Sequence, residues 1–294
     1  MTSWAFIKMH GCGNDYLFLD GFSQPVPDDI SSFARSVSDR HRSVGSDGVV
    51  LMLPPVHPEA VGRMRMFNAD GSEGSLCGNA LRCFAMWLQQ SGRAGTQFLM
   101  EMDGRLIDTT ILGSDVQQRR ANVRIEVGTP KPVSMGTASN AACCSPVHLE
   151  GIHVPGLRVT ALHVSMGNPH TVFFVDDLEE VPFHELGPQI EKHSAFPDRT
   201  NVEFVQVLGL QEARVRVWER GSGETLACGS GACAVVVAGV AAELLNQHQP
   251  TTVHMAGGDL QVFMDQNLQV FLEGPAEECC RGTVQWPASS REQD

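Results

Sequence analysis

The sequence lacks several features that mark secreted, membrane and redox proteins. Residues 1–8 contain neither the basic stretch nor the long apolar run of a signal peptide. The longest apolar stretch, residues 231–242, is well short of the roughly 20 residues that a membrane span requires, so we expect a buried helix there. No two cysteines have the CxxC spacing of dithiol redox sites and zinc sites. We therefore expect a cytoplasmic protein that has no membrane partner.

Basic residues are also scarce. Lysine and arginine number 21 against 34 acidic residues, and the formal net charge of −13 argues against nucleic acid as a partner, because phosphate binding needs a basic surface. The lysines are Lys8, Lys131 and Lys192. Lys131 lies between two prolines and Lys192 follows a charged, helix-like stretch, so neither resembles the Schiff-base lysine of a pyridoxal enzyme. We expect no cofactor, with pyridoxal phosphate as the weaker alternative.

The composition is that of an ordinary globular protein. A chain of 294 residues, 42% of them hydrophobic, is long enough for two domains with cores of their own. Its nine cysteines are an odd number without a secretion signal, which favours reduced thiols over a disulfide framework. The adjacent pairs Cys143-Cys144 and Cys279-Cys280 have no metal-ligand partners at CxxC spacing, so we interpret them as incidental and expect no metal site.

An internal repeat organises the sequence. Residues 63–67 and residues 214–218 both alternate arginine with an apolar residue and end on an aromatic, the pattern of a half-buried strand. The same offset of 151 residues continues without a gap to three further pairs: Glu73 with Glu224, Cys77 with Cys228, and Gly78 with Gly229. Both halves also carry a Gly-Asn pair, at Gly13-Asn14 and Gly167-Asn168, ahead of an apolar strand. The repeat predicts two similar domains related by a pseudo-twofold axis.

Each Cys-Gly pair precedes a predicted helix. In the first half Leu81, Phe84 and Leu88 recur at helical spacing, and the run stops near residues 91–92. In the second half residues 232–245 are apolar nearly all round, which indicates a helix enclosed by sheet. Each half thus predicts a turn, a strand, a helix, an Arg-alternating strand, a turn, Cys-Gly and a buried helix. We expect loop in residues 134–154 and a frayed end in the last eight residues.

Cys77 and Cys228 differ from the other cysteines by this position. A lone buried cysteine, such as Cys12, Cys83 or Cys233, is usually a small hydrophobic residue. A thiol at a helix N-terminus lies near unpaired N–H groups and the positive dipole end, which favour a thiolate and also bind a carboxylate. A pseudo-twofold axis would bring one thiol to each face of a carboxylate-bearing carbon. This geometry predicts removal of a proton from one face and its return on the other, with N–H dipoles stabilising the carbanion.

Five motifs resemble those of the diaminopimelate epimerases. They are KMHGCGND at residues 8–15, FNADGSE at 67–73, CGN at 77–79, SMGNPH at 165–170 and ERGSGETLACGSGAC at 219–233. The resemblance runs from residue 7 to about residue 282 and implies epimerisation of LL-diaminopimelate to the meso isomer, a step toward lysine and peptidoglycan, without pyridoxal phosphate or metal. It implies an α+β fold with two pseudo-symmetric domains, each a mixed sheet wrapped around a central helix. We assign residues 1–127 plus 276–294 to the first half and 128–275 to the second, and expect a homodimer.

The resemblance also implies roles for individual residues. Cys77 and Cys228 would be the acid and base. Reacting carboxylate would bind at Gly78, Asn79, Gly229 and Ser230, and the ammonium groups and distal carboxylate at Asn14, Asn68, Asn168, Asn201, Glu219 and Arg220. His170 and Glu219 would tune the cysteines. Four residues depart from the family pattern: Gly48, where some members carry glutamine, the pair Ala80-Leu81, and Trp218 in place of tyrosine.

The residue types agree with most of these roles. Arg220 offers a bidentate fork for a distal carboxylate, and asparagines suit zwitterions because they donate and accept without net charge. Asn14 and Asn168 also suit turns after glycine, and His170 suits a strand core equally well. The alternatives are a racemase of the same fold acting on another amino acid such as histidine, a thiol-redox or zinc-binding protein, and a binding module with inert cysteines.

Overall fold

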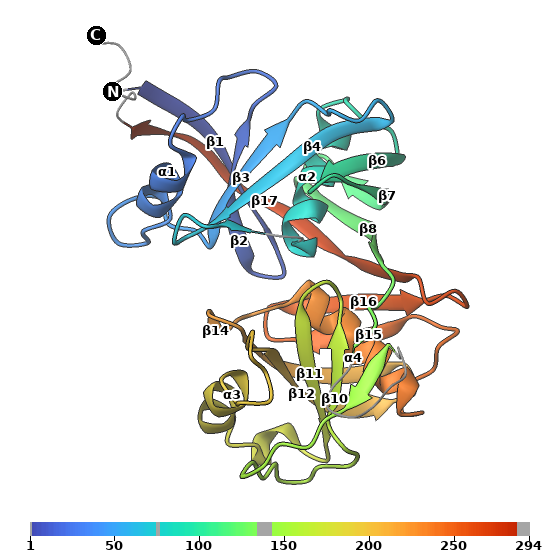
Figure 1. Cartoon of the computed structure of the whole chain (residues 1–294). Helices are drawn as coiled ribbons and strands as arrows, with labels where there is room; N and C mark the ends of the chain where they lie inside the picture. Colours follow the sequence, from blue (N-terminus) through green and yellow to red (C-terminus); the bar gives the residue numbers. More distant parts are fainter. Residues whose placement is uncertain (1, 75–76, 134–142, 287–294) are drawn as a thin grey trace. The chain divides into compact units, whose positions relative to one another are not determined.

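The computed structural model describes residues 2–74, 77–133 and 143–286. The chain divides into two compact units, which we describe separately: unit 1 is Met1–Ile125 with Gly274–Asp294, and unit 2 is Glu126–Glu273 (Figure 1). The sequence-based assignment changes halves at residues 127 and 275. Within the described ranges, no helix combines the length and the apolar character that crossing a bilayer would require.

The strands of unit 1 pair in a closed circuit. They are β1 (Thr2–Gly11), β2 (Asn14–Asp20), β3 (Gly48–Leu53), β4 (Ala60–Asn68), β5 (Glu73–Gly74), β6 (Gln97–Met102), β7 (Arg105–Asp115), β8 (Arg120–Gly128) and β17 (Val270–Trp286). The pairing order is β1-β2-β3-β4-β6-β7-β8-β17, and β17 pairs again with β1. The β2–β3 and β4–β6 pairs are parallel. The β1–β17, β1–β2, β3–β4, β6–β7 and β7–β8 pairs are antiparallel.

Unit 2 repeats this order of pairing. Its strands are β9 (Cys144–Pro146), β10 (Leu162–Ser165), β11 (Pro169–Val175), β12 (Asn201–Gly209), β13 (Glu212–Glu219), β14 (Gly223–Glu224), β15 (Thr251–Met255) and β16 (Gly258–Met264), followed by the first residues of β17. The parallel pairs lie at equivalent places: β11–β12 corresponds to β2–β3, and β13–β15, whose strands flank the buried helix in sequence, corresponds to β4–β6. The internal repeat seen in the sequence is therefore a repeat of topology.

The repeat extends to individual side chains. Arg65 forms an ion pair with Glu73 across β4 and β5 at 2.7 Å, and Arg216 pairs with Glu224 across β13 and β14 at 2.9 Å. Both β4 and β13 alternate buried and less buried residues, as the arginine alternation predicts. Each ion pair holds the short hairpin that leads into the buried helix of its unit.

The two enclosed helices are α2 (Gly78–Gln90) in unit 1 and α4 (Gly229–Ala241) in unit 2. Helix α2 lies against β1, β2, β4 and β7, and α4 lies against β9, β10, β11, β12 and β16 (Figure 1). The residues of α4 from Ala232 to Gly239 are all buried, and they are small or β-branched. Such side chains let strands approach a helix on every side, so the prediction of a helix enclosed by sheet is confirmed.

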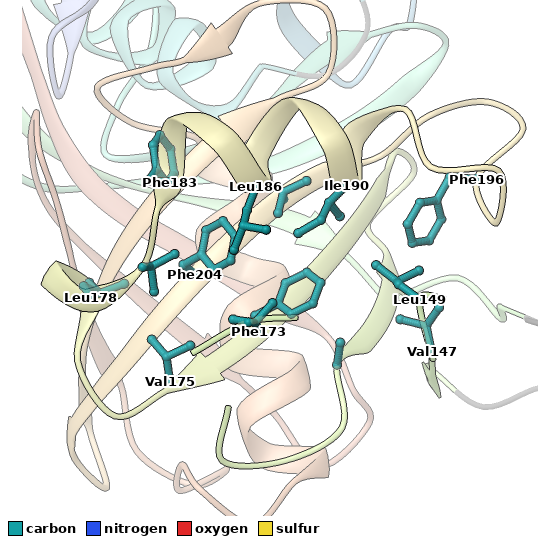
Figure 2. Packing of buried hydrophobic residues seen from close by; sticks show 14 residues of the cluster. Val147, Leu149, Phe173, Val175, Leu178, Phe183, Leu186, Ile190, Phe196 and Phe204 are labelled. Atoms are coloured by element: carbon teal, nitrogen blue, oxygen red, sulfur yellow. The ribbon is translucent and has the colours of Figure 1, made fainter. Parts of the chain in front are cut away.

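A second helix in each unit covers the outside of the sheet. Helix α1 (Ile30–Val37) packs against β3 and β4. In unit 2, α3 (Phe183–Glu191) packs against β12 and β13 after a 3-10 turn, η1 (Leu178–Glu180). Figure 2 shows Phe183 of α3 directed at Phe204, with ring centroids 5.8 Å apart, and Phe173 stacked on the same ring at 5.4 Å. These aromatic contacts fix α3 over the strands that carry part of the candidate site.

Some sequence-based expectations need correction. Strands β3 and β12 are absent from the predicted order of elements, because β3 is buried along most of its length and has no alternating pattern. Helix α4 ends at Ala241 rather than Leu245, since Glu243 adopts a φ of 58° that ends the helix. The expected loop of residues 134–154 contains β9; residues 134–142 and the last eight residues lie outside the described residues.

Candidate functional site

Cys77 and Cys228 occupy the same structural position in their units. Each is the N-cap of the enclosed helix, with φ and ψ of −120° and 106° at Cys77 and −124° and 111° at Cys228. The extended conformation at an N-cap turns the side chain toward the first N–H groups of the helix, which have no partner within the helix. The Gly231 N–H donates to Cys228 Sγ at 3.4 Å. The Cys77 side chain makes no capping hydrogen bond to the described residues of its helix. Both thiols lie beside a helix N-terminus, whose backbone N–H groups suit the binding of an anion.

Asn14, Tyr16 and Asn79 surround the thiol of Cys77, and we call these four residues the Cys77 cluster. The Cys77 thiol donates to Asn14 Oδ1 at 3.8 Å, and Tyr16 Oη lies 3.5 Å from Cys77 Sγ. Asn79 Nδ2 donates to the same Asn14 oxygen at 3.2 Å, and Asn79 is buried. Two of the asparagines predicted from the sequence thus meet at Cys77.

The amide nitrogen of Asn14 is held by a second hydrogen bond, on the side away from Cys77's acceptor Oδ1. Its Nδ2 donates to Asp47 Oδ2 at 2.7 Å, and Asp47 also accepts from Arg40 at 2.8 Å. Asn79 Oδ1 accepts from Arg82 Nη2 at 2.7 Å, and Arg82 is fully buried. These partners fix which atom of each amide faces the thiol, so the amides near Cys77 have defined orientations.

Asn68 lies at the end of β4, two strands away from Tyr16. Gly48 of β3 pairs with Tyr16 on one side and with Asn68 on the other. The Asn68 amide donates to Ser72 Oγ at 2.9 Å, which stabilises the turn before Glu73. A Cβ built on Gly48 would overlap the carbonyl oxygen of Phe67, so the backbone here has no room for a side chain. In this chain a side chain at position 48 would therefore require the backbone of β3 or β4 to shift.

Asn168, His170 and Ser230 lie around Cys228, and we call these four residues the Cys228 cluster. Asn168 Nδ2 donates to Ser230 Oγ at 3.2 Å, and Ser230 Oγ lies 3.5 Å from Cys228 Sγ. His170 Nε2 lies 3.0 Å from Asn168 Oδ1. His170 is connected to Cys228 through Asn168 and Ser230, by this chain of hydrogen bonds.

The pKa of Cys228 corrects one expectation from the sequence. The helix N-terminus was expected to lower the pKa of the thiol. Instead, burial raises the pKa of Cys228 well above its ordinary value, and the carboxylates of Glu219 and Glu203 raise it further. The hydrogen bonds from Ser230 and Gly231 oppose this shift and are outweighed. Cys228 is therefore held as a thiol, the form that can donate a proton.

Glu219, Arg220 and Asn201 form a connected group at the ends of β12 and β13. The Arg220 N–H donates to Asn201 Oδ1 at 2.8 Å, and Asn201 Nδ2 donates to Pro169 O at 2.8 Å. Glu219 accepts from Thr225 Oγ1 at 2.6 Å, and burial raises the pKa of its carboxyl. Arg220 is exposed, and its guanidinium donates to the backbone carbonyl of Asp198 at 3.0 Å. The guanidinium retains further donors for an outside carboxylate.

The sequence did not point to two residues that contact Cys77, Cys228 or their hydrogen-bond partners. Tyr16 contacts Cys77, and Glu203 lies fully buried with Oε1 2.6 Å from His170 Nδ1. A signal for Tyr16 was present, because it follows Asn14 by two residues as His170 follows Asn168. Glu203 had no such signal, since it is a charged residue within an apolar strand and its partner lies 33 residues earlier in the chain.

Among the other cysteines, Cys83 is buried in the core, and Cys143 and Cys144 are an adjacent, half-buried pair. Burial raises the pKa of the Cys83 thiol, as expected for a small core residue. Cys143 and Cys144 have sulfurs 3.8 Å apart, and their hydrogen bond lowers the pKa of Cys143 to about 6. Among the described residues no group of three or more His, Cys, Asp or Glu side chains could hold a metal ion.

A family model and full-length relatives identify the family of this chain. The model of diaminopimelate epimerase matches residues 6–133 and 162–278. The diaminopimelate epimerase of Moorella thermoacetica is 44% identical over 279 residues, covering 94% of this chain and 98% of the relative. The chain belongs to the diaminopimelate epimerase family. This membership confirms the resemblance carried by the five motifs and makes the chain an isomerase.

Further comparisons agree with this family. The diaminopimelate epimerase of Geobacillus thermodenitrificans is 41% identical over 284 residues, covering 96% of this chain and 97% of the relative. Two solved structures share the fold at low identity. A phenazine biosynthesis protein of the PhzF family from Bacillus anthracis has a TM-score of 0.72 at 15% identity, covering 97% of this chain and 100% of its own. A hydroxyproline epimerase from Agrobacterium vitis has a TM-score of 0.62 at 14% identity, covering 96% and 92%. The predicted α+β fold of two similar halves is confirmed.

Glu203→Gln is expected to lower the free energy of unfolding by about 1–3 kcal/mol, because a buried charge-assisted hydrogen bond to His170 is replaced by a neutral one. Urea denaturation followed by circular dichroism would measure the change. Glu179→Gln is the matched control: Glu179 has a side chain that is 79% exposed, and its loss is expected to leave stability unchanged. Equal stability of the two variants would contradict a structural role for the His170–Glu203 pair.

Proposed function

We propose that this chain interconverts LL-2,6-diaminopimelate and meso-diaminopimelate with two cysteine thiols and without pyridoxal phosphate or metal. One observation carries the proposal: Cys77 and Cys228 cap the equivalent enclosed helices of the two repeats with nearly the same backbone angles. A repeated thiol suits a reaction that needs an acid and a base in matching positions. The substrate is inferred from the relatives, which are diaminopimelate epimerases. The product would serve lysine and peptidoglycan synthesis.

In the proposed reaction one cysteine begins as a thiolate and the other as a thiol. The thiolate removes the Cα proton, and the thiol returns a proton to the opposite face of the same carbon. The enzyme ends with the two protonation states exchanged, so no proton is gained or lost overall. The raised pKa of Cys228 supports its starting as the thiol when Cys77 is the base.

The carbanion formed at Cα needs strong electrostatic stabilisation. We propose that the reacting carboxylate binds to the first N–H groups of the two helices, at Gly78, Asn79, Gly229 and Ser230. The distal carboxylate and the ammonium groups would bind Asn14, Asn68, Asn168, Asn201, Glu219 and Arg220. His170 and Glu219 would tune the pKa of the cysteines, which the effect of Glu219 on Cys228 supports.

The proposal extends to organisation. We propose that the two units are the two epimerase halves and that each supplies one thiol to the reaction. We propose further that the enzyme is a cytoplasmic homodimer, as its family resemblance implies.

The proposal predicts deuterium incorporation from solvent. Incubating the enzyme with LL-diaminopimelate in D₂O, after dialysis against EDTA, is expected to give the meso isomer with deuterium at the inverted Cα. Proton NMR and chiral chromatography would measure the exchange and the isomer ratio. Absence of exchange from protein that shows its native circular dichroism spectrum would refute the proposal.

A racemase of another amino acid is separated from this proposal by the same assay. Arg220 and Asn201 favour a substrate with a distal carboxylate, which histidine lacks. We expect a panel that includes histidine to show exchange only with the diaminopimelate isomers. Faster exchange into histidine would favour the alternative substrate and retain the two-thiol chemistry.

A further inference from the structure

The one tyrosine of the chain lies against a proposed reacting thiol. Tyr16 is buried in β2, and its Oη is 3.5 Å from Cys77 Sγ. Its ring contacts Phe18 edge-on, with centroids 6.5 Å apart. The hydroxyl is therefore the polar atom that this otherwise apolar side chain presents to the Cys77 cluster.

Resting on the proposed function, we propose that Tyr16 is a positioning residue whose hydroxyl donates a hydrogen bond to the Cys77 thiolate and stabilises the form that accepts the substrate proton. A thiolate has no proton and can only accept this bond. A thiol can instead donate its own proton to Asn14 Oδ1, at 3.8 Å. The bond from Tyr16 is stronger to the anion than to the neutral thiol, so it lowers the free energy of the thiolate.

The surroundings of Tyr16 keep its proton in place. Burial, followed by the charge of Cys77, raises the pKa of Tyr16 well above its ordinary value, so the phenol stays protonated. Asn14 is fixed by Asp47 at 2.7 Å and by Asn79 at 3.2 Å, and its oxygen stays directed at the thiol. When Cys77 takes a proton, the new S–H bond can point to Asn14 while Tyr16 keeps its own proton.

The repeat supports a special role for this strand position. Tyr16 pairs with Gly48 in the parallel β2–β3 pair, as His170 pairs with Asn201 in the parallel β11–β12 pair. His170 belongs to the Cys228 cluster, and its Nδ1 lies 2.6 Å from Glu203 Oε1. The charges of Glu219 and Glu203 both raise the pKa of the Cys228 thiol. At equivalent strand positions, Tyr16 thus offers a neutral hydroxyl to Cys77, whereas His170 is bonded to Glu203 and joins the hydrogen-bond chain that leads to Cys228.

Tyr16→Phe removes only the hydroxyl and tests this inference directly. The rate of alkylation of Cys77 by iodoacetamide would be followed against pH by mass spectrometry of the Cys77 peptide. We expect the midpoint of this profile to rise by about one pH unit in the variant. The peptide with the exposed Cys279-Cys280 pair is the internal control and is expected to keep its profile. An unchanged Cys77 midpoint would overturn the inference.

Because the chain has a single tyrosine, biosynthetic incorporation of 3,5-difluorotyrosine changes Tyr16 alone. Fluorination makes the phenol a stronger donor, so the Cys77 midpoint is expected to fall, opposite to the effect of Tyr16→Phe. This test holds even if Tyr16→Phe folds poorly. A midpoint that does not fall would contradict donation to the thiolate.

Kinetics separate this inference from the proposed function. The acid limb of the pH profile of kcat/KM is expected to move upward in Tyr16→Phe together with the Cys77 midpoint. Epimerisation by the unaltered enzyme with an unchanged Cys77 midpoint in the variant would refute the role of Tyr16 alone. A shifted midpoint in a protein that epimerises no diaminopimelate would refute the substrate alone.

Discussion

Cys77→Ala and Cys228→Ala are each expected to lower kcat for epimerisation by about 10³-fold or more, because each removes an acid–base group that the proposed reaction uses in every turnover. The double variant is expected to be about as inactive as either single variant, since the two thiols act as a unit. Initial rates of meso-diaminopimelate formation would measure these losses. Near-normal turnover by either single variant would rule out the two-thiol scheme.

Cys83→Ala and Cys233→Ala are the matched controls for these losses. Each lies in the enclosed helix that begins directly after one of the proposed reacting thiols, and both side chains are fully buried. Their loss removes one buried sulfur and leaves the helix N-terminus intact. We expect both controls to retain most of the activity. If either control were as inactive as Cys77→Ala, the loss of activity would have to be attributed to the cavity left in the packing of the helix.

Gly48→Ala is expected to cause a large loss of stability for the addition of a single methyl group. The added Cβ would overlap the carbonyl oxygen of Phe67 in the adjacent strand, and a backbone atom cannot turn aside as a side chain can. Strands β3 and β4 would have to separate along a pairing that includes Gly48 with Asn68. We expect a loss of about 3 kcal/mol and a thermal midpoint lower by roughly 6 °C or more.

Gly113→Ala is the matched control for Gly48→Ala. Gly113 also lies in a strand, β7, but a Cβ there meets no heavy atom within 4 Å. We expect its thermal midpoint to stay the same or to rise slightly, because alanine restricts the unfolded chain. Differential scanning calorimetry of both variants would measure the contrast. Equal midpoints for the two variants would show that β3 and β4 adapt to the added methyl group.

The repeat made much of the fold predictable. Its signal is local and regular: alternating arginines in two strands, a carboxylate and a cysteine at the same offset, and an apolar helix after each cysteine. Such patterns depend on the geometry of single strands and helices, which a sequence can display. Strands β3 and β12 were missed because a strand buried on both faces has no alternation.

The candidate site was predictable only as a set of residues. The motifs named Asn14, Asn79 and Cys77 without showing that they share hydrogen bonds, and they did not single out Tyr16. Parallel pairing of β2 with β3 and of β11 with β12 decides which side chains line up beside each thiol. That register depends on distant segments, so it was not visible in the sequence.

The sequence by itself determined that two equivalent cysteines precede two equivalent helices. It also determined the family to which the chain belongs. Only the tertiary structure decided the chemical character of the Cys228 thiol. The sequence predicts that a helix begins after Cys228, and a helix N-terminus favours a thiolate. Burial raises the pKa of Cys228, and so do Glu203 of β12 and Glu219 of β13. Together they outweigh the preference for the thiolate. A pKa is set by all charges and solvent within a few ångströms, and those neighbours are assembled by folding.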